Sequence, residues 1–226
     1  MRIGELLGAG RSADVYALDE KWVLRRYRDG MDATPEWMVM AYLAAHGCPV
    51  PRLGPRDAKT PPGDLLLERL DGPTMLDALM AEELSADEAG ALLAGLLAEL
   101  HTVPARVSPH PGDRILHLDL HPGNVMLTDR GPVVIDWSNA AEGAPALDRA
   151  MSALILAQIA VDPASPLSGR ARILLGALAP QLTASGPVPA PHVAEAARHR
   201  TANPTMTPHE RALIEPAAAL VRELTS

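Results

Sequence analysis

The sequence predicts an α+β fold with two lobes, a small antiparallel sheet followed by a mainly helical lobe. Short apolar segments separated by glycine and proline fill the first 70 residues, which is typical of short strands. Longer segments with helical spacing of leucine and alanine follow from residue 85 onwards. Within that second part, residues 115–137 combine short apolar runs with histidine, aspartate and asparagine, which are residue types that can perform chemistry.

The chain begins with a predicted hairpin of two short strands, Ile3–Leu7 and Asp14–Leu18. The tip between them contains Gly8, Gly10 and Ser12. Glycine lets backbone N–H groups approach a phosphate that larger side chains would keep away. The alternative is a simple turn, because two glycines separated by one residue are common. The neighbouring elements must decide between the two.

A third strand is predicted over Lys21–Tyr27, and it contains two adjacent arginines. Because side chains alternate along a strand, Arg25 shares a face with Val23, and Arg26 lies on the opposite face. Such a strand can present one arginine to a ligand. The alternative is that both arginines are solvated charges at the edge of the sheet.

A helix is predicted to begin at Thr34–Glu36, with threonine as the capping residue and proline in the first turn. Glu36 is then a first-turn acid, which the helix dipole stabilises without any partner. A strand follows at Leu65–Glu68, and a lobe boundary is predicted near residue 70. The predicted lobes are residues 1–70 and 71–226. In the second, a capping box at Ser85–Glu88 opens a helix that runs to His101.

The candidate catalytic residues lie in the segment ILHLDLHPGNVMLTDRGPVVIDW. His117, Asp119 and Asn124 have the spacing H-x-D-x-x-x-x-N, and Asp136 ends a later apolar strand. Phosphoryl transfer needs this set, with Asp119 to align and deprotonate a substrate hydroxyl. Asn124 and Asp136 offer the hard oxygen ligands that Mg²⁺ prefers when it also binds ATP phosphates. Each residue alone could be part of a turn, but their joint spacing makes a chance match improbable.

Short strands surround these residues. Arg114–Leu118 enters the loop, Val125–Thr128 leaves it, and Val133–Ile135 follows the turn Asp129–Pro132. A β-hairpin of the last two strands would place the two aspartates and the asparagine at adjacent strand ends. Carboxylates gathered there would repel one another without a cation, which favours a bound metal ion.

The sequence HLDLHPGN followed by IDW resembles the catalytic loop and metal-binding segment of the aminoglycoside phosphotransferase family. That family is the small-molecule branch of the protein-kinase-like fold. The resemblance implies a bilobal fold with a catalytic loop at 117–124 and a metal segment at 135–137. It implies that Asp119 is the catalytic base and that the asparagine and aspartate of these segments hold Mg²⁺. His117 and His121 would brace the loop.

The resemblance extends to the first lobe. The glycine-containing tip would bind nucleotide phosphates, and the third strand would carry a phosphate-binding base, usually lysine. Matching Trp22–Arg25 to the kinase pattern V-A-I-K makes Arg25 that contact, with Arg26 or Lys21 as the alternatives. Arginine is longer and planar, so it does not reproduce lysine geometry automatically. Glu36 resembles the helix glutamate that pairs with this base.

The resemblance also assigns a hinge and a supporting acid. Residues 68–72 would form the hinge, where the backbone around Glu68 and Leu70 binds the adenine edge. Asp148 resembles the aspartate that buttresses the active-site loops. Helices are predicted from Asp148 to about Val161, from Leu167 to Ala179, and from Thr207 to the C-terminus.

Composition fits a soluble enzyme. The 226 residues are 47% hydrophobic and carry a net charge of −8, so nucleic acid is an unfavourable partner. The N-terminal segment has no apolar core of signal-peptide length, and no apolar run is long enough to span a membrane. A cytoplasmic location is therefore expected. Residues 140–226 contain as many acids as arginines, whereas a polycationic antibiotic would favour an acidic wall.

The predicted function is transfer of the γ-phosphate of ATP or GTP, with Mg²⁺, to a hydroxyl of a small molecule. The acceptor class stays open between an aminoglycoside and a smaller hydroxylated metabolite. A catalytically weak or inactive kinase-like nucleotide-binding module is the alternative, because arginine stands where relatives carry lysine and a fold can outlive its activity.

Overall fold

The computed structural model describes residues 3–226, and the chain divides into two compact units. The first takes in residues up to Pro73 together with Met126–Ser138, and the second comprises Thr74–Val125 and Asn139–Ser226. The sequence predicts one boundary near residue 70, whereas the first unit also takes in a segment from within the predicted second lobe. The chain therefore passes between the units three times.

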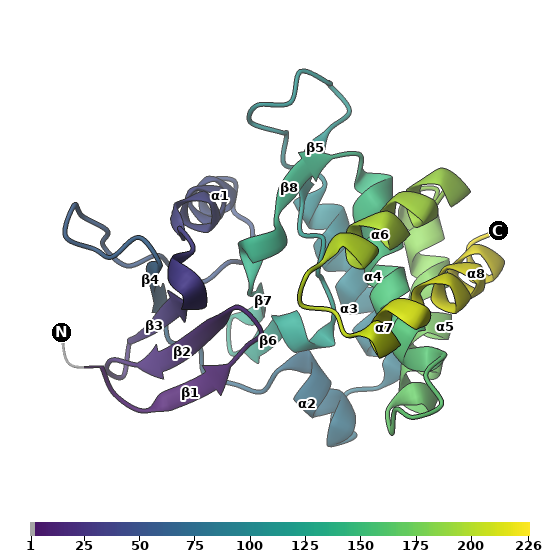
Figure 1. Ribbon diagram of the computed structural model, residues 1–226, viewed down its shortest axis with the longest axis horizontal. Helices are drawn as coiled ribbons and strands as arrows, with labels where there is room; N and C mark the ends of the chain where they lie inside the picture. Colours follow the sequence, from purple (N-terminus) through teal and green to yellow (C-terminus); the bar gives the residue numbers. More distant parts are fainter. Residues whose placement is uncertain (1–2) are drawn as a thin grey trace. The chain divides into compact units, whose positions relative to one another are not determined.

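The first unit is built on a four-stranded antiparallel sheet with the strands in sequence order (Figure 1). Its strands are β1 (Leu6–Ala9), β2 (Ala13–Ala17), β3 (Trp22–Tyr27) and β4 (Asp64–Glu68). The predicted first strand began and ended too early, and Gly8 lies in β1 next to a register irregularity. All four residues of β1 are exposed. The strand therefore has no buried face whose apolar residues would indicate its position in the sequence.

One helix, α1 (Thr34–Ala45), completes the N-terminal part of this unit after a short 3₁₀ turn, η1 (Arg28–Gly30). Thr34 is the first helical residue and does not cap the helix as predicted. Instead Asp32 accepts hydrogen bonds from the backbone N–H of Thr34 at 2.9 Å and from its hydroxyl at 2.6 Å. The N-cap itself is Ala33, which makes no side-chain cap bond, so Asp32 orders the turn before the helix through the local backbone bond typical of aspartate.

The hairpin β6 (Val125–Thr128) and β7 (Gly131–Val134) brings the later segment into the first unit. Backbone hydrogen bonds tie it to the N-terminal part, from Leu127 N to Pro73 O at 2.9 Å and from Val134 N to Pro49 O at 2.8 Å. Because these bonds satisfy strand N–H groups, the hairpin has a fixed place beside residues distant in sequence.

The second unit is mainly helical, with one small strand pair (Figure 1). Strand β5 (Arg114–Leu116) pairs antiparallel with β8 (Ala141–Gly143). Short 3₁₀ turns, η2 (Pro122–Asn124) and η3 (Trp137–Asn139), flank the hairpin. The helices are α2 (Met75–Met80), α3 (Ala86–Leu100), α4 (Pro145–Ala160), α5 (Ser168–Ser185), α6 (Ala190–Ala202), α7 (Pro208–Ala212) and α8 (Ile214–Leu224).

Helix α4 is the centre of this unit, with 14 of its 16 residues buried. It packs against α5, α6 and α8, and its buried residues include the polar Asp148, Arg149, Ser152 and Gln158. Helix α3 approaches α5 closely at Gly90, where a Cβ would lie 3.1 Å from backbone atoms of α5. None of the helices within residues 3–226 has both the length and the apolar character that crossing a membrane requires.

The helix predictions for the second unit need four corrections, one of them at α5, which ends at Ser185 and not at Ala179. Helix α4 begins at Pro145, three residues before the predicted start. The single predicted C-terminal helix is two helices, although the predicted cap at Thr207 is present and Glu210 completes a capping box. Helices α2 and α6 were not predicted. The first has six residues, and only Val193 and Ala196 of α6 are buried, so neither gives a clear apolar period.

Candidate active site

Asp119 lies on the loop that follows β5, and its side chain is 26% exposed. Its backbone N–H donates to Nδ1 of the buried His117 at 3.1 Å. The amide Nδ2 of Asn124 donates to the Asp119 carbonyl oxygen at 2.9 Å. The loop backbone is thus held on both sides of Asp119. Within residues 3–226 the contacts found for its carboxylate are long, at 3.5 Å with Asn124 and Asn139 and at 3.9 Å with Arg200.

Asp148 fixes the segment just before Asp119. Its Oδ2 accepts from the backbone N–H of His117 at 2.9 Å, and its Oδ1 accepts from that of Leu118 at 2.8 Å. His101 Nε2 lies 3.1 Å from Oδ2. Burial alone would raise the pKa of the Asp148 carboxyl, but the bonds from His101 and His117 outweigh it and lower the pKa. Asp148 is therefore a buried anion held by donors.

Those hydrogen bonds hold a strained backbone. Leu118 has a φ of 59°, a left-handed conformation that residues with a Cβ rarely adopt. Such conformations cost about 1–3 kcal/mol and persist where the surroundings determine them. Here the carboxylate of Asp148 binds the N–H groups of Leu118 and of the residue before it.

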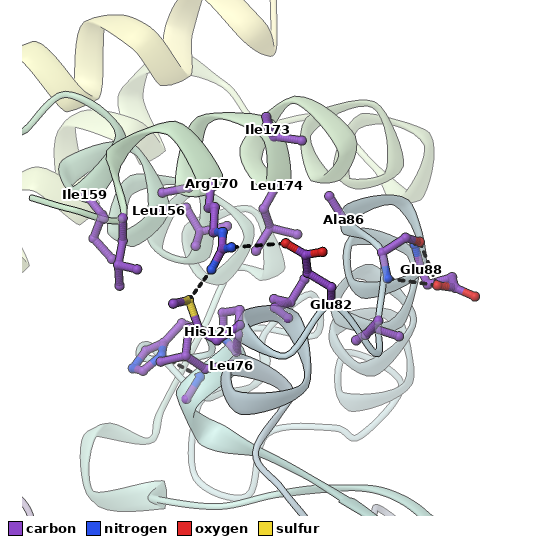
Figure 2. Close-up of a pocket in the computed structure, with 18 of the residues that line it drawn as sticks. Leu76, Glu82, Ala86, Glu88, His121, Leu156, Ile159, Arg170, Ile173 and Leu174 are labelled. Carbon is purple, nitrogen blue, oxygen red and sulfur yellow. Dashed lines mark hydrogen bonds and ion pairs between the residues drawn. The ribbon is translucent and has the colours of Figure 1, made fainter.

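His121 follows Asp119 by two residues on the same loop. Its Nδ1 accepts from Gly123 N at 3.1 Å, which caps the η2 turn. The ring also lines a cavity of about 540 Å³ between α2, α4 and α5. Figure 2 shows His121 at one wall of this mostly apolar cavity, with Leu156 and Arg170 on the helices around it. Asp119 is not among the residues that line it, so an acceptor hydroxyl bound there would not meet the base.

The first unit contains a buried charge cluster centred on Arg25. Its Nη1 donates to Glu36, and its Nη2 donates to Asp136 Oδ1 at 2.7 Å. The guanidinium lies 4.6 Å from the centre of the Tyr27 ring, and the Tyr27 hydroxyl donates to Glu36 at 2.7 Å. Burial would lower the pKa of Arg25, but attraction to the two carboxylates outweighs it and raises the pKa. Arg25 is thus a buried cation on two anions, rather than a solvated edge charge.

The other candidates for the third-strand base have different surroundings. Arg26 forms a two-pronged pair with Asp64, at 2.7 and 2.6 Å. Lys21 is exposed before β3 begins. Glu36, for which pairing and dipole stabilisation were both open, pairs with Arg25 and also accepts from Trp137 N at 3.0 Å.

Asp136 has an open side to its carboxylate. Its Oδ1 accepts from Arg25 and, at 2.7 Å, from the Ser138 hydroxyl, while no bond to Oδ2 is found within residues 3–226. The side chain is 37% exposed, and φ is 60°. In Asn124, Nδ2 donates to Asp119, and no bond to the side-chain Oδ1 is found in the described part of the chain, residues 3–226. Both residues therefore have a free oxygen of the type that suits Mg²⁺.

The remaining nucleotide-site candidates lie in the first unit. Gly8 and Gly10 are exposed, and Gly10 N donates to Ala13 O at 2.9 Å, which closes the turn between β1 and β2. Ser12 is half-buried in that turn. Glu68 ends β4 and accepts two hydrogen bonds from Arg130 at 2.9 Å, and Leu70 follows half-buried.

A cavity of about 530 Å³ opens onto Asp119 from within the second unit. Its charged and polar lining comprises Asp119, Asn139, Arg198, His199, Arg200 and Asn203. The sequence analysis predicts no role for these two arginines or for His199. The one available signal was the cluster R-H-R near the end of a segment with weak helical periodicity. Tyr27, His101 and Ser138 were also missed. Only His101 has a distant partner, Asp148, whereas Tyr27 bonds to Glu36 nine residues later and Ser138 bonds to Asp136 two residues earlier.

Comparisons with known proteins show the family and the fold of the chain. A model of the phosphotransferase enzyme family (APH) matches residues 4–116 and 109–180. No curated protein matches the sequence. Among solved structures, the gentamicin complex of APH(2")-IIa has a TM-score of 0.58 at 13% identity, covering 98% of this chain and 91% of that one.

Two further structures have the same fold. A choline/ethanolamine kinase family protein from Mesorhizobium loti has a TM-score of 0.58 at 13% identity, covering 99% of this chain and 88% of that one. ADP-bound APH(2'')-Ib has a TM-score of 0.56 at 13% identity, covering 100% and 94%. The predicted α+β protein-kinase-like fold is thereby confirmed. Because the family model covers most of its length, the chain belongs to the phosphotransferase enzyme family.

Proposed function

We propose that this chain transfers the γ-phosphate of a nucleoside triphosphate to a hydroxyl group of a small molecule. The observation that carries the proposal is Asp119, a partly exposed carboxylate on a fixed backbone that opens into a cavity of about 530 Å³. A cavity of this size suits a small-molecule acceptor. Family membership gives the reaction class, and Asp119 gives it a base.

In this reaction Asp119 orients the acceptor hydroxyl and takes its proton. The acceptor oxygen forms a bond to the γ-phosphorus as the bond from that phosphorus to the β–γ bridging oxygen breaks, and the nucleoside diphosphate leaves. Asn124 and Asp136 would hold Mg²⁺, which supplies positive charge to the phosphates when bound. Arg25 keeps the Asp136 carboxylate in place through Oδ1 and leaves Oδ2 for the metal.

The nucleotide is proposed to bind to the first unit. Gly8, Gly10 and Ser12 would offer backbone N–H groups to phosphates, and the backbone near Glu68 and Leu70 would bind the base. Arg25 would contact a phosphate with N–H groups that Glu36 and Asp136 leave over, since a guanidinium has five donors. ADP and ATP complexes among the structural neighbours support a nucleotide donor, without choosing between ATP and GTP.

A second candidate is a nucleotide-binding module with weak or no transfer activity. The specific observation in its favour is the position of Arg25, whose charge is matched by two carboxylates. A guanidinium engaged in this way has less freedom than a lysine ammonium to follow a phosphate through the reaction. The second candidate predicts tight nucleotide binding without product.

The test is phosphate transfer from Mg·ATP and Mg·GTP to a panel of hydroxylated acceptors, followed by mass spectrometry of the acceptor. Asp119→Asn keeps the shape of the side chain and removes the base, so the rate should fall by about 10²–10⁴-fold. Equal turnover by both proteins would remove Asp119 from the mechanism. Nucleotide binding with no transfer to any acceptor would favour the module.

Among the neighbours, one is a complex with gentamicin and one belongs to a choline/ethanolamine kinase family. Those names point to acceptors with amino groups. The acceptor panel should therefore include amines, neutral alcohols and acids, so that it does not presuppose the charge of the acceptor.

A further inference from the structure

The cavity at Asp119 has a positive lining. Arg198 and Arg200 are its permanently charged cations, Asp119 is its single acid, and Asn139 and Asn203 are neutral. This local charge is opposite in sign to the net charge of −8 for the whole chain. Since a cavity focuses the field of the groups that line it, the lining says more about the acceptor than the total charge does.

Arg200 is fixed next to the base. Its side chain is 17% exposed, its Nε donates to Gln158 on α4, and its Nη1 lies 3.9 Å from Asp119 Oδ1. The guanidinium offsets the charge of the carboxylate at the place where an acceptor must bind. An anionic acceptor can therefore approach Asp119 without facing an uncompensated negative charge.

Arg198 offers a second cation from the last turns of α6. It is exposed, and neither a hydrogen bond nor an ion pair is found for it within the described residues 3–226. It also lines an adjoining cavity with Arg211, Arg222 and one acid, Glu215. The positive surface thus continues outward from the base along α6.

From this arrangement we infer that the acceptor is an anion, a hydroxylated small molecule that carries a carboxylate or phosphate group. Arg198 and Arg200 bind the oxyanion, for which the planar guanidinium fork is well suited, and Asp119 receives the hydroxyl. A polyamine acceptor would meet two like charges in the same cavity. The inference rests on the proposed phosphotransfer, since it names the acceptor of that reaction.

The test uses four open-chain polyols that differ at one end. Gluconate carries a carboxylate, sorbitol 6-phosphate a phosphate, sorbitol a hydroxyl, and glucamine an ammonium group. Transfer from Mg·ATP to each is measured as kcat and KM. At least one of the two anions should exceed sorbitol by about tenfold or more in kcat/KM, and glucamine should be the poorest acceptor. Comparison of gluconate with sorbitol 6-phosphate shows whether the site prefers a carboxylate or a phosphate group on the acceptor.

Variants connect the preference to the cavity. Arg198→Gln should lower the ratio of kcat/KM between the preferred anion and sorbitol, mainly through KM. Arg172→Gln, which removes an exposed arginine of α5 outside the cavity, should leave that ratio unchanged. Circular dichroism melts of both variants check the fold. A preference for sorbitol or glucamine, or a ratio unaffected by Arg198→Gln, would overturn the inference.

Calorimetry with Mg²⁺ and a non-hydrolysable ATP analogue separates this inference from the proposed function. If an anionic polyol binds to the wild type and not to Arg198→Gln, and no phosphate is transferred to any of the four polyols, the anion site is supported and the phosphotransfer is rejected. Phosphate transfer to sorbitol or glucamine, without transfer to either anionic polyol, would support phosphotransfer and reject the anion site. Absence of anion binding at millimolar concentration, with no transfer to either anion, would also reject the site.

Discussion

The two aspartates of the candidate site are held in opposite ways. In the first unit, the carboxylate of Asp136 bonds directly to Arg25, a buried cation. In the second unit, the contacts found for the Asp119 carboxylate within residues 3–226 are all long, and the buried anion Asp148 holds the backbone before it. Both residues sit at or next to a left-handed backbone position, at Asp136 itself and at Leu118.

The difference matches the two proposed roles. A metal ligand needs a fixed carboxylate, and a direct bond from arginine supplies that. A base needs an oxygen that is free to accept a proton, so fixing the main chain and leaving the side chain open serves it better. The same chemical group is thus held through its side chain in one unit and through its peptide in the other.

The largest expected change in stability comes from removing the cation behind Asp136. Arg25→Met leaves Glu36 and Asp136 without their shared partner, and breaking a buried pair in this way costs about 3–5 kcal/mol. Urea denaturation would measure the loss. Arg52→Met, at an exposed arginine 4.0 Å from Glu68, is the control and should cost about 0–1 kcal/mol. Similar losses of unfolding free energy in the two variants would contradict the contrast between the two aspartates, because Arg25 would then not be the group that holds Glu36 and Asp136.

A smaller loss of stability is expected from weakening the anion behind Asp119. Asp148→Asn keeps the shape but puts an N–H donor where two acceptors are needed, which should cost about 1–3 kcal/mol. As a positioning residue, Asp148 should affect kcat of transfer more than nucleotide affinity. Calorimetry of nucleotide binding beside steady-state kinetics separates the two. A loss of nucleotide affinity as large as the loss of kcat would show that Asp148 supports the whole unit and not the loop.

The smallest effect is a pH dependence. Because the pKa of Asp148 is lowered in the folded state, its contribution to stability is present above its unfolded pKa of about 3.9 and is lost as pH falls through the folded value. The difference in unfolding free energy between the wild type and Asp148→Asn should therefore shrink as pH falls below about 4. Urea titrations at several acidic pH values would measure it. A difference that stays constant would mean that Asp148 is not an anion in the folded protein.

The sequence marks the candidate catalytic segment more clearly than its surroundings. Asp119, Asn124 and Asp136 are predicted from local spacing, because phosphoryl-transfer chemistry restricts their types and separations along the chain, and their roles stay predictions. Arg198 and Arg200 lie about 80 residues after Asp119 and were not predicted, since only the packing of α6 on α4 brings them to it. The pairing of Arg25 with Asp136, residues 111 positions apart, is a similar case.

The same distinction explains the errors in the fold. Helix α3 was predicted correctly because its capping box and buried leucines are local signals. The first strand was misplaced because all its residues are exposed and its apolar pattern carries no register. Helix α6 was missed because it is held by two buried side chains and by its neighbours, not by its own periodicity.

The threefold passage of the chain between its units has a consequence for recombination between relatives. A single exchange of gene segments at Pro73 would bring in β1–β4 and α1 from one parent while keeping the hairpin Met126–Ser138 from the other. Arg25 and Asp136 would then come from different parents, and so would the carbonyl and the N–H that join Pro49 to Val134. In such chimeras the Arg25–Asp136 ion pair consists of one residue from each parent. The first unit can be exchanged intact only if both of its segments, residues up to Pro73 and Met126–Ser138, come from the same parent. The sequences of these two segments therefore constrain each other in evolution.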